Sequence, residues 1–461
     1  MFEMSGKYTT ARVFAAVMES KCSSQVYSFL NHPAFTNPVA IMPDTHAGEG
    51  SVIGFTMRIT DKVIPNVIGV DKGCGMLSIC LGKLQIDDFY TLDQEIRERI
   101  PTGASVHEAP IINVAAKFPW GNVMRAIRSM KQAAPENFGY ETFKARCKEI
   151  GIDLGYAECS LGTLGGGNHF IEMGRSGAGD LWLTVHSGSR NLGKKVCEHW
   201  QRRANGELKK RQQTTLKGEI EKIRATCSGR EIEDRIREAR AKMGFGIPSA
   251  LAWLEGEQAA GYISDMLFAQ VYAHVNRALI AGRILDILNN AMGLKVAVQD
   301  RIETIHNFID PGDMIIRKGA IRSYTGERMI IPFNMRDGFA ICEGKSNPEW
   351  NFSAPHGAGR RMSRTDAKET VDMDRFREQM SGIFSTSICR GTLDEAPEVY
   401  KDTREILELI EPTVKILDMV KPVYNLKDTT AALEEHIELL RSLTHPDGGH
   451  AGHIMKGPSC S

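Results

Sequence analysis

Paired-cysteine motifs are missing from this 461-residue sequence. Its 10 cysteines include no CxxC pair, and their low density is typical of reduced thiols rather than of a disulfide scaffold. No run approaches the roughly 18 apolar residues that a membrane-spanning helix needs. The segment MFEMSGKYTTARVF also lacks the uninterrupted apolar stretch of a secretory signal. We therefore expect a cytoplasmic protein with no membrane partner.

An excess of charge of either sign is also missing. Lys and Arg together number 57, and Asp and Glu also number 57, so the formal net charge is zero and the pI is about 7.2. This balance excludes a polybasic surface that binds nucleic acid everywhere, although it leaves room for a local basic groove. Hydrophobic residues at 42% and charged residues at 25% are typical of an ordinary globular chain.

Internal repeats and low-complexity tracts are absent as well, which disfavours a solenoid. Short β-type runs, such as VAIM at 39–42 and LWLTV at 181–185, lie beside glycine clusters. Apolar residues at three- and four-residue spacing predict a long buried helix over 257–293. Helices are also predicted at 402–420 and 430–442. Because strands and helices alternate irregularly, we expect an α+β fold with central β-sheets surrounded by helices.

Charged residues dominate one predicted helical segment. Residues 198–243 are predicted to form two helices that are broken near Ser228-Gly229. Between 201 and 240, twelve Lys or Arg residues accompany seven Asp or Glu residues. The segment is either a solvated helical arm or an arm that faces RNA.

Histidine placement carries the main chemical signal. Four histidines occupy turns bounded by glycine, and a fifth lies in a polar His–Asn pair; these are His46, His169, His186, His356 and His306. Glycine lets the backbone approach a ligand closely, and free N–H groups in such turns can hold an anion. One such histidine is more often structural, but five in one chain favour a functional cluster.

A tight loop, GVDKGCGM, places Asp71 and Cys74 three residues apart. Thiolate and imidazole are borderline-soft metal ligands, and a carboxylate adds a harder one. Combined with several histidines, they suit zinc, manganese, iron or cobalt rather than calcium or magnesium alone. Taken alone, the loop fits a buried thiol in a turn that Asp71 caps somewhat better than it fits a metal site.

Two other segments indicate a phosphorylated ligand. LGTLGGGNHFIE is similar to a phosphate-binding loop without matching the G-x-G-x-x-G or Walker patterns, and it places Asn168 and Glu172 around His169. HGAGRRMSR joins His356 to three arginines, whose guanidinium groups can bind phosphate in bidentate fashion. His356 could therefore be a metal ligand, a proton carrier or a nucleophile toward phosphorus.

These segments, in this order, resemble the RtcB family of GTP- and manganese-dependent RNA ligases. The matching segments run from about residue 40 to 428 and are PDTHAGEGSVIGF, VIGVDKGCGM, LGTLGGGNHFIE, HSGSRNLG, HN at 306–307, RKGA at 317–320, HGAGRRMSR, DEAPEVYKD and KPVYNLKD. The resemblance implies a single large RtcB-like catalytic domain over residues 1–428, with the charged arm at about 198–245. A C-terminal extension would follow at 429–461.

A site for two manganese ions is the first implication of the resemblance. Cys74 would bridge the two ions. His186 and His306 would bind one ion, and Asp71 and His169 would bind the other.

The nucleotide site is the second implication. His356 matches the family's nucleophile, which attacks the α-phosphate of GTP and becomes a histidine–GMP adduct. The nucleotide-binding positions correspond to Asn168, Glu172, Asn334 (where the family usually has serine), Ala358, Gly359, Tyr400 and Lys427, and the RNA or phosphate contacts to Arg190 and Arg360. Lys427 is preferred over Lys456 as the residue that reads the base, because MVKPVYNLKD preserves the preceding family context.

The implied activity is the joining of an RNA 3′-phosphate or 2′,3′-cyclic phosphate to a 5′-hydroxyl, in RNA repair or tRNA splicing. RNA and GTP are then the expected partners, while an accessory protein partner stays unidentified. Two other classes stay open. One is a metal-dependent phosphohydrolase or nuclease in which His356 never carries GMP, and the other is a non-catalytic RNA-binding relative.

Overall fold

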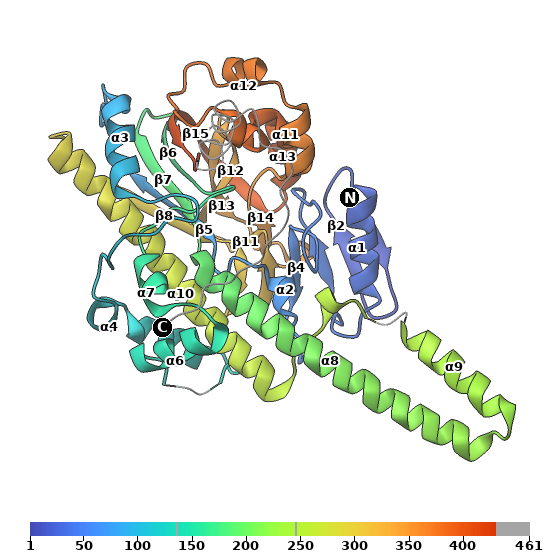
Figure 1. Cartoon of the computed structure of the whole chain (residues 1–461). Helices are drawn as coiled ribbons and strands as arrows, with labels where there is room; N and C mark the ends of the chain where they lie inside the picture. The colour runs from blue at the N-terminus through green and yellow to red at the C-terminus, as the bar shows by residue number, and fades with distance from the viewer. Residues whose placement is uncertain (135–136, 245–246, 430–461) are drawn as a thin grey trace, which may run out of the picture.

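Strands occupy the centre of the molecule and helices surround them (Figure 1). The computed structural model describes residues 1–134, 137–244 and 247–429. Its large sheets and enclosing helices confirm the predicted α+β class. Within these described ranges, none of the helices has the length and apolar composition that a bilayer crossing requires.

The larger sheet has seven antiparallel strands in the order β12-β13-β15-β6-β7-β5-β8. These strands are β5 (Gly75–Cys80), β6 (Phe170–Arg175), β7 (Leu181–Ser187), β8 (Asp300–Ile305), β12 (Arg328–Asn334), β13 (Gly338–Gly344) and β15 (Val414–Leu426). Strand β7 confirms the strand predicted from LWLTV.

This sheet curves until its two outermost strands meet. Arg328 of β12 forms ion pairs with Asp300 of β8, with N–O distances of 2.5 and 2.6 Å. The concave face encloses an apolar cluster that includes Met76, Trp182, Ile302, Phe339 and Val420. The inner face of the sheet is therefore packed with side chains from most of its strands.

A second sheet has six strands in the order β1-β2-β3-β4-β10-β9. These are β1 (Phe2–Ser5), β2 (Thr10–Val13), β3 (Val39–Ile41), β4 (Phe55–Arg58), β9 (Asn307–Ile309) and β10 (Ile315–Lys318), and a separate pair is formed by β11 (Ala320–Arg322) and β14 (Ser353–Pro355). Strand β3 confirms the strand predicted from VAIM.

The shortest connection between the two large sheets is one residue long. Strand β8 of the seven-stranded sheet ends at Ile305 and β9 of the six-stranded sheet begins at Asn307, so only His306 separates these two strands. The N–H of Gly319, which lies between β10 and β11, donates to the carbonyl of His306 at 2.6 Å. The chain therefore fixes His306 at the junction through its backbone.

Helix α10 (Gly256–Asp286) confirms the long buried helix that the apolar spacing predicts. It packs against β5 and β7, and a short π-helical segment, Ile287–Ala291, continues it. Strands β5 and β7 are buried along their whole length, because α10 covers one face and the concave cluster fills the other. Such two-sided burial explains the continuous apolar run in LWLTV.

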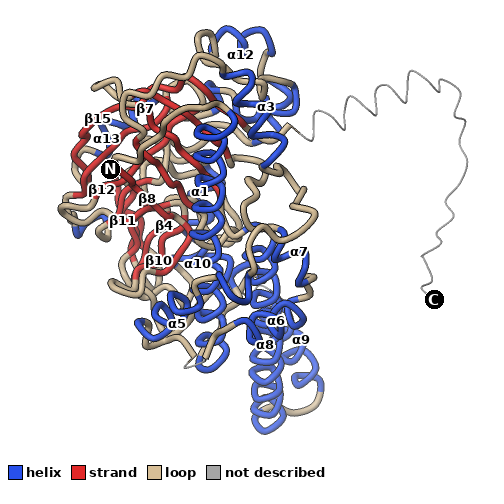
Figure 2. Tube along the Cα trace, turned by 90° about the vertical axis from the view of Figure 1, so that its left-hand side faces the viewer, coloured by secondary structure: helices blue, strands red, loops and turns tan. Residues whose placement is uncertain are grey.

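The charged arm is a pair of packed helices, α8 (Arg190–Thr226) and α9 (Arg230–Gly244). The break between them lies at residues 227–229, as predicted. Figures 1 and 2 show that the distal half of α8 and all of α9 project away from the body. The first helix of the arm begins before residue 198, where it was predicted to begin, because α8 starts at Arg190 inside the body.

The remaining helices lie around the sheets, and several begin at a residue whose side chain accepts a backbone hydrogen bond, such as Asp88, Asp153 and Ser363. They are α1 (Ser20–Leu30), α2 (Pro65–Ile68), α3 (Phe89–Arg99), α4 (Val114–Lys117), α5 (Trp120–Ser129), α6 (Tyr140–Ile150), α7 (Leu154–Cys159), α11 (Arg364–Thr370), α12 (Met373–Gln379) and α13 (Thr403–Ile410), with 3-10 turns at Ser249–Leu251, Pro348–Trp350, Arg390–Glu395 and Pro397–Val399.

One helix prediction is wrong in its second half. The predicted helix at 402–420 ends with α13 at Ile410, and β15 occupies the rest of the segment. Strand β15 lies between β13 and β6 and pairs with both, so tertiary hydrogen bonding overrides the local preference. The helix predicted at 430–442, and the extension beyond residue 429, lie outside the described residues.

Candidate metal centre and nucleotide pocket

Four chain segments bring the predicted metal ligands together. Asp71 and Cys74 lie on the loop before β5, His169 precedes β6, His186 lies on β7 and His306 follows β8. Because β6, β7, β5 and β8 are consecutive neighbours in the sheet, these five side chains meet at one end of it.

The five residues form two groups that share Cys74. One group is Cys74, His186 and His306, and the other is Asp71, Cys74 and His169, with the candidate ligand atoms of each group within 4.8 Å of one another. The Sγ atom of Cys74 lies 3.5 Å from Nε2 of His169 and 3.4 Å from Nε2 of His186. The family resemblance implies the same division of these five residues into two groups that share Cys74.

Hydrogen bonds from the surrounding chain engage one polar atom on each of two of these residues, His169 and Asp71, and their remaining atoms face each other at 3.2 Å. The Nδ1 atom of His169 lies 2.9 Å from the carbonyl of Leu164, so Nδ1 carries the proton and Nε2 keeps its lone pair. The N–H and hydroxyl of Ser189 donate to Oδ1 of Asp71 at 2.8 and 2.9 Å, which leaves Oδ2 facing His169. A Cβ atom at Gly188 would overlap the Asp71 carboxylate, so only glycine fits there.

The electrostatics of the cluster favour a bound cation. Burial lowers the pKa of His186 and of His306 far below the usual value, so both imidazoles are neutral near pH 7, as ligands must be. Burial and the Asp71 carboxylate raise the pKa of the Cys74 thiol, so a thiolate here needs a cation beside it. Neutral imidazoles, a carboxylate and a thiolate are donors that fit manganese, iron, cobalt or zinc.

Sequence reasoning missed Arg277, which supports this centre from α10. Its side chain is fully buried, and Nη1 donates to the carbonyls of Gly73 and Ser187 at 2.8 and 2.9 Å. These two residues adjoin the candidate ligands Cys74 and His186. An ion pair of 2.9 Å with Glu303 holds the guanidinium in place.

Its neighbour Asn276 supports the same centre in a different way. The side-chain carbonyl accepts from the N–H groups of Gly162 and Thr163 at 2.7 and 3.2 Å. The amide donates to the Thr163 carbonyl, the Ser187 hydroxyl and the Gly188 carbonyl. Asn276 therefore joins the glycine-rich loop before His169 to the segment after His186. A consecutive Asn and Arg inside a buried helical pattern was the available sequence signal.

His356 lies beside the metal cluster, just after β14. Its ring centroid is 4.7 Å from that of His306. Its Nδ1 atom lies 2.6 Å from Oδ2 of Asp44, a fully buried residue on the loop after β3. This contact leaves Nε2 as the ring nitrogen without a partner in the described structure. Sequence reasoning missed Asp44, although it lies two residues before His46 in PDTHAGEG.

A glycine allows the two loops to meet. Gly359 has φ of +75°, and a Cβ atom there would overlap the backbone carbonyl of Asp44. The loop from His356 to Gly359 therefore lies directly on the Asp44 loop. Lys401 reinforces the contact, because its Nζ donates to the carbonyls of Pro43 and Thr45, both at 2.8 Å.

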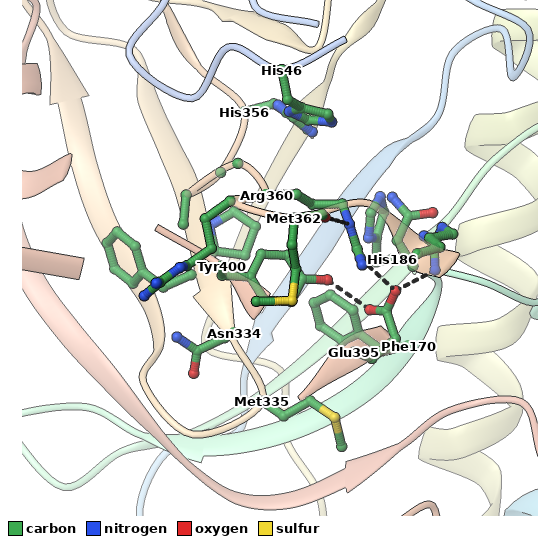
Figure 3. A pocket seen from close by; sticks show the side chains of 18 of the residues that line it. His46, Phe170, His186, Asn334, Met335, His356, Arg360, Met362, Glu395 and Tyr400 are labelled. Carbon is green, nitrogen blue, oxygen red and sulfur yellow. Dashed lines mark hydrogen bonds and ion pairs between the residues drawn. The ribbon is translucent and has the colours of Figure 1, made fainter. Parts of the chain in front are cut away.

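A pocket of about 820 Å³ opens next to His356 and His186. It is lined by all seven predicted nucleotide residues and by Arg360, a predicted RNA or phosphate contact; the seven are Asn168, Glu172, Asn334, Ala358, Gly359, Tyr400 and Lys427. Figure 3 shows His46 and His356 together at one end, with Tyr400 and Glu395 farther along. The pocket is thus continuous from the candidate nucleophile to a group of charged and aromatic side chains.

Glu395 organises this second end of the pocket, and sequence reasoning missed it. Its carboxylate accepts from the Tyr400 hydroxyl at 2.7 Å and from Nζ of Lys427 at 2.8 Å, and it contacts Arg364 at 2.6 Å. Burial alone would raise the pKa of Glu395, but Lys427 and Arg364 more than offset it and lower that pKa to about 2. Arg360 lies over the Tyr400 ring, with 5.5 Å to its centroid.

A second buried carboxyl group in the pocket behaves in the opposite way. Burial raises the pKa of Glu172 to about 8, so the group is mostly protonated near pH 7. The amide of Asn425 donates to Oε2 of Glu172 at 2.9 Å. A protonated Glu172 can also donate a hydrogen bond, which an ionised carboxylate cannot.

Two predicted residues have different surroundings from the others. Asn334 lines the pocket, but its side chain closes the turn after β12: the carbonyl accepts from the N–H groups of Arg336 and Asp337, and the amide donates to the Asp337 carboxylate. Arg190 is not among the pocket-lining residues; it contacts the Thr163 hydroxyl at 3.0 Å and the Gly103 carbonyl at 2.6 Å. Arg190 also has φ of +56°, an unusual conformation for arginine.

Comparison with known proteins places the chain in a family. A family model described as tRNA-splicing ligase RtcB matches residues 25–429. RNA-splicing ligase RtcB of Escherichia coli strain K12 is 27% identical over 417 residues, covering 85% of this chain and 90% of that protein. tRNA-splicing ligase RtcB of Archaeoglobus fulgidus is 24% identical over 469 residues, covering 87% of this chain and 89% of that protein. The family match spans most of the chain and confirms the resemblance drawn from the motifs: the protein belongs to the RtcB family.

Proposed function

We propose that this protein is an RNA ligase that joins an RNA 3′-phosphate or 2′,3′-cyclic phosphate to a 5′-hydroxyl through a GMP adduct on His356. The names of the relatives, RNA-splicing and tRNA-splicing ligases, support the substrate and the reaction class. The observation that carries the chemistry is the contact of Nδ1 of His356 with Asp44, which leaves Nε2 as the reactive nitrogen at the pocket.

Two manganese ions are the cofactors that we propose. Asp71, Cys74, His169, His186 and His306 would hold them, since the donor types and the two groups that share Cys74 suit a pair of transition-metal ions. Ions bound there would neutralise phosphate charge and orient the α-phosphate of GTP for in-line displacement.

In the first step, Nε2 of His356 attacks the α-phosphorus of GTP. The N–P bond forms, the bond to the β-phosphate oxygen breaks, and pyrophosphate leaves. The imidazole gains positive charge as the bond forms, and the Asp44 carboxylate, which accepts the Nδ1 proton in a hydrogen bond, stabilises that charge. Asp44 also keeps the ring in the tautomer whose Nε2 has a free lone pair.

In the following steps, the GMP group moves from Nε2 to an oxygen of the RNA 3′-phosphate, and His356 regains its lone pair. The 5′-hydroxyl then attacks the activated phosphorus, the new phosphodiester forms, and GMP leaves. A 2′,3′-cyclic phosphate is first hydrolysed to a 3′-phosphate. Arg190 and Arg360 would contact phosphate groups of the substrates.

The other end of the pocket suits the nucleoside. Asn168, Glu172, Asn334, Ala358, Gly359, Tyr400 and Lys427 would contact GTP, and Lys427 would read the base. Tyr400 and Lys427 are both held by the Glu395 carboxylate, so their positions are set before any ligand binds. Such preorganisation lowers the entropy that binding loses.

The setting that we propose is RNA repair or tRNA splicing in the cytoplasm. The described cysteines are all free thiols, which supports a reducing compartment. Residues 1–428, including the arm, would act as one catalytic unit that residues 429–461 extend.

The test is to incubate the protein with α-labelled GTP and manganese and to separate it by denaturing electrophoresis. We expect a labelled protein band that mild acid removes and alkali does not, because protonating the imidazole turns it into a good leaving group. The band should be missing from His356→Ala, which should still seal RNA whose 3′-end already carries GMP. A label on Lys427, or no label at all, would instead favour a metal-dependent phosphohydrolase or nuclease.

A further inference from the structure

The charge of the chain is distributed unevenly, and α8 carries the largest excess. Its 37 residues include eleven Lys or Arg and four Glu, a net charge of +7, although the whole chain has a formal charge of zero. Helix α9 has nearly balanced charges, with five basic and four acidic residues. The positive charge of the arm therefore belongs to α8.

Part of this charge forms a line along the helix, which we call the basic stripe: Arg202, Lys209, Lys217 and Arg224. Spacings of seven, eight and seven residues keep the four side chains within about 80° of one another around the helix axis. All four side chains are exposed. The stripe extends over about 33 Å at 1.5 Å per residue.

Members of the stripe lack acidic partners, unlike most of the other basic residues of α8. Arg203 pairs with Glu149 at 3.0 Å, and Arg211 pairs with Glu255 at 3.1 Å, so these side chains fasten the helix to the body. No ion pair between described residues involves any member of the basic stripe. None of the four side chains is therefore in ion-pair contact with a carboxylate of the described residues, and one exposed acidic residue, Glu221, lies a helical turn from both Lys217 and Arg224.

Helix α8 also connects the stripe to the candidate active site. Ser189, the residue before α8, donates two hydrogen bonds to the Asp71 carboxylate. From there the helix extends about 55 Å, and Figure 1 shows it leaving the body with α9 packed along its distal part. The stripe begins about 18 Å from the start of the helix.

We propose that the basic stripe binds the phosphate backbone of the RNA substrate outside the pocket while the RNA end occupies the pocket. This inference rests on the proposed function for the identity of the RNA as substrate. A row of unpaired cations over about 33 Å matches a polyanion with regularly spaced charges. The stripe would hold RNA without reading its sequence, because phosphate contacts carry no base information.

The surface composition favours RNA over a membrane. None of the large hydrophobic side chains that are exposed in the described structure lies on α8, so the helix has no apolar face to insert into lipid. The positions between the basic residues on this face include exposed Gly206 and Gln213, which leave the phosphate groups of a bound strand unobstructed.

The test compares two variants of the full-length protein with equal changes of charge. In the stripe variant, Arg202, Lys209, Lys217 and Arg224 are all replaced by Gln. In the control variant, Lys222, Arg230, Arg235 and Arg237 of the same arm are replaced by Gln. Gln has nearly the helix propensity of Lys and Arg, so both arms should stay helical, which circular dichroism checks.

The measurement is fluorescence anisotropy of labelled RNA with a 3′-phosphate, at several salt concentrations. One RNA is long enough to span α8, and the other is a short oligonucleotide that fills only the pocket. For the long RNA, the stripe variant should bind about tenfold or more weakly at moderate salt, and its slope of log affinity against log salt should be smaller by about three. The control variant should bind the long RNA within about twofold of the unmodified protein, and the short RNA should bind equally to all three.

Several results would overturn the proposal. They are an unchanged salt slope in the stripe variant, an equal loss in the control variant, or a loss that affects vesicles of anionic phospholipid instead of RNA. If the stripe variant is not helical, the double variant K209Q/K217Q replaces it and should lose about half of the slope change. The GMP adduct of the unmodified protein, measured separately, shows whether a negative result belongs to the stripe or to the proposed ligase function.

Discussion

The Nδ1 atom of His356 lies 2.6 Å from Oδ2 of the fully buried Asp44, across a contact between two loops that Gly359 makes possible. A carboxylate at this distance both orients the imidazole and stabilises a positive charge on it. The pair joins the loop after β3 to the loop after β14, so the candidate nucleophile contacts a residue 312 positions away.

Asp44→Asn should slow formation of the GMP adduct by about 100-fold or more, because an amide cannot stabilise the imidazolium and can present its NH₂ group to Nδ1. Single-turnover labelling with α-labelled GTP measures the rate. Bound manganese, measured on the same sample, should be unchanged, since Asp44 lies outside the metal cluster. A rate near that of the unmodified protein would mean that Asp44 only fills space.

Cys74→Ser should remove metal while leaving the fold largely intact. The thiolate would supply negative charge to both groups of ligands, whereas a serine hydroxyl stays protonated and binds borderline-soft metals poorly. Metal content after dialysis, measured by mass spectrometry, and the circular dichroism spectrum check the two halves of this expectation. The matched control is Cys227→Ser, at the turn of the arm, which should retain its metal. Full metal content in Cys74→Ser would exclude Cys74 from the site.

Arg277→Lys should weaken manganese binding by about 10- to 100-fold, because a lysine cannot hold the Gly73 and Ser187 carbonyls and Glu303 simultaneously. Isothermal titration calorimetry with manganese measures the affinity. Arg283→Lys on the same helix is the control, since Arg283 makes one exposed hydrogen bond to the Arg99 carbonyl. If both variants bound manganese with equal affinity, Arg277 would stabilise the fold without contributing to manganese binding.

Glu172→Gln should stabilise the ligand-free protein in a pH-dependent way. Burial raises the pKa of folded Glu172 to about 8 from 4.5. A carboxyl with a raised folded pKa contributes stability that is fully present below the unfolded pKa and is lost as pH rises through the folded pKa. The free energy of unfolding of the variant should therefore equal that of the natural protein below about pH 4.5. Near pH 8 it should be higher by up to about 4 kcal/mol. Denaturant unfolding at several pH values tests this, and a difference independent of pH would contradict it.

Lys427→Ala should raise the GTP concentration needed for adduct formation by about tenfold or more, because Lys427 is buried in the pocket and paired with Glu395. Lys456→Ala is the control and should have no effect, and truncation after Asp428 should leave the adduct measurable. If Lys456→Ala is the damaging change, the base reader is the lysine of the C-terminal extension.

Local patterns predicted the elements whose signals lie within one segment. The apolar spacing found α10, and the charge pattern with Ser228-Gly229 found the break between α8 and α9. Strand β15 was missed because its state depends on pairing with β13 and β6, which lie far away in the sequence. Asp44, Arg277 and Glu395 were missed for a related reason, since each acts on side chains or carbonyls from other segments.

The sequence by itself determined the chemistry that is available and the family, because residue types such as Cys74, His169 and His356 stand in short motifs whose glycines permit close approach. Tertiary structure alone decided which of these groups meet. The order of β6, β7, β5 and β8 sets five candidate metal ligands into two groups around Cys74, and the contact of Gly359 with the Asp44 loop leaves Nε2 as the ring nitrogen of His356 without a partner among the described residues. Distances of about 3 Å between residues hundreds of positions apart are set by packing and hydrogen bonding of the whole fold, which no local pattern encodes.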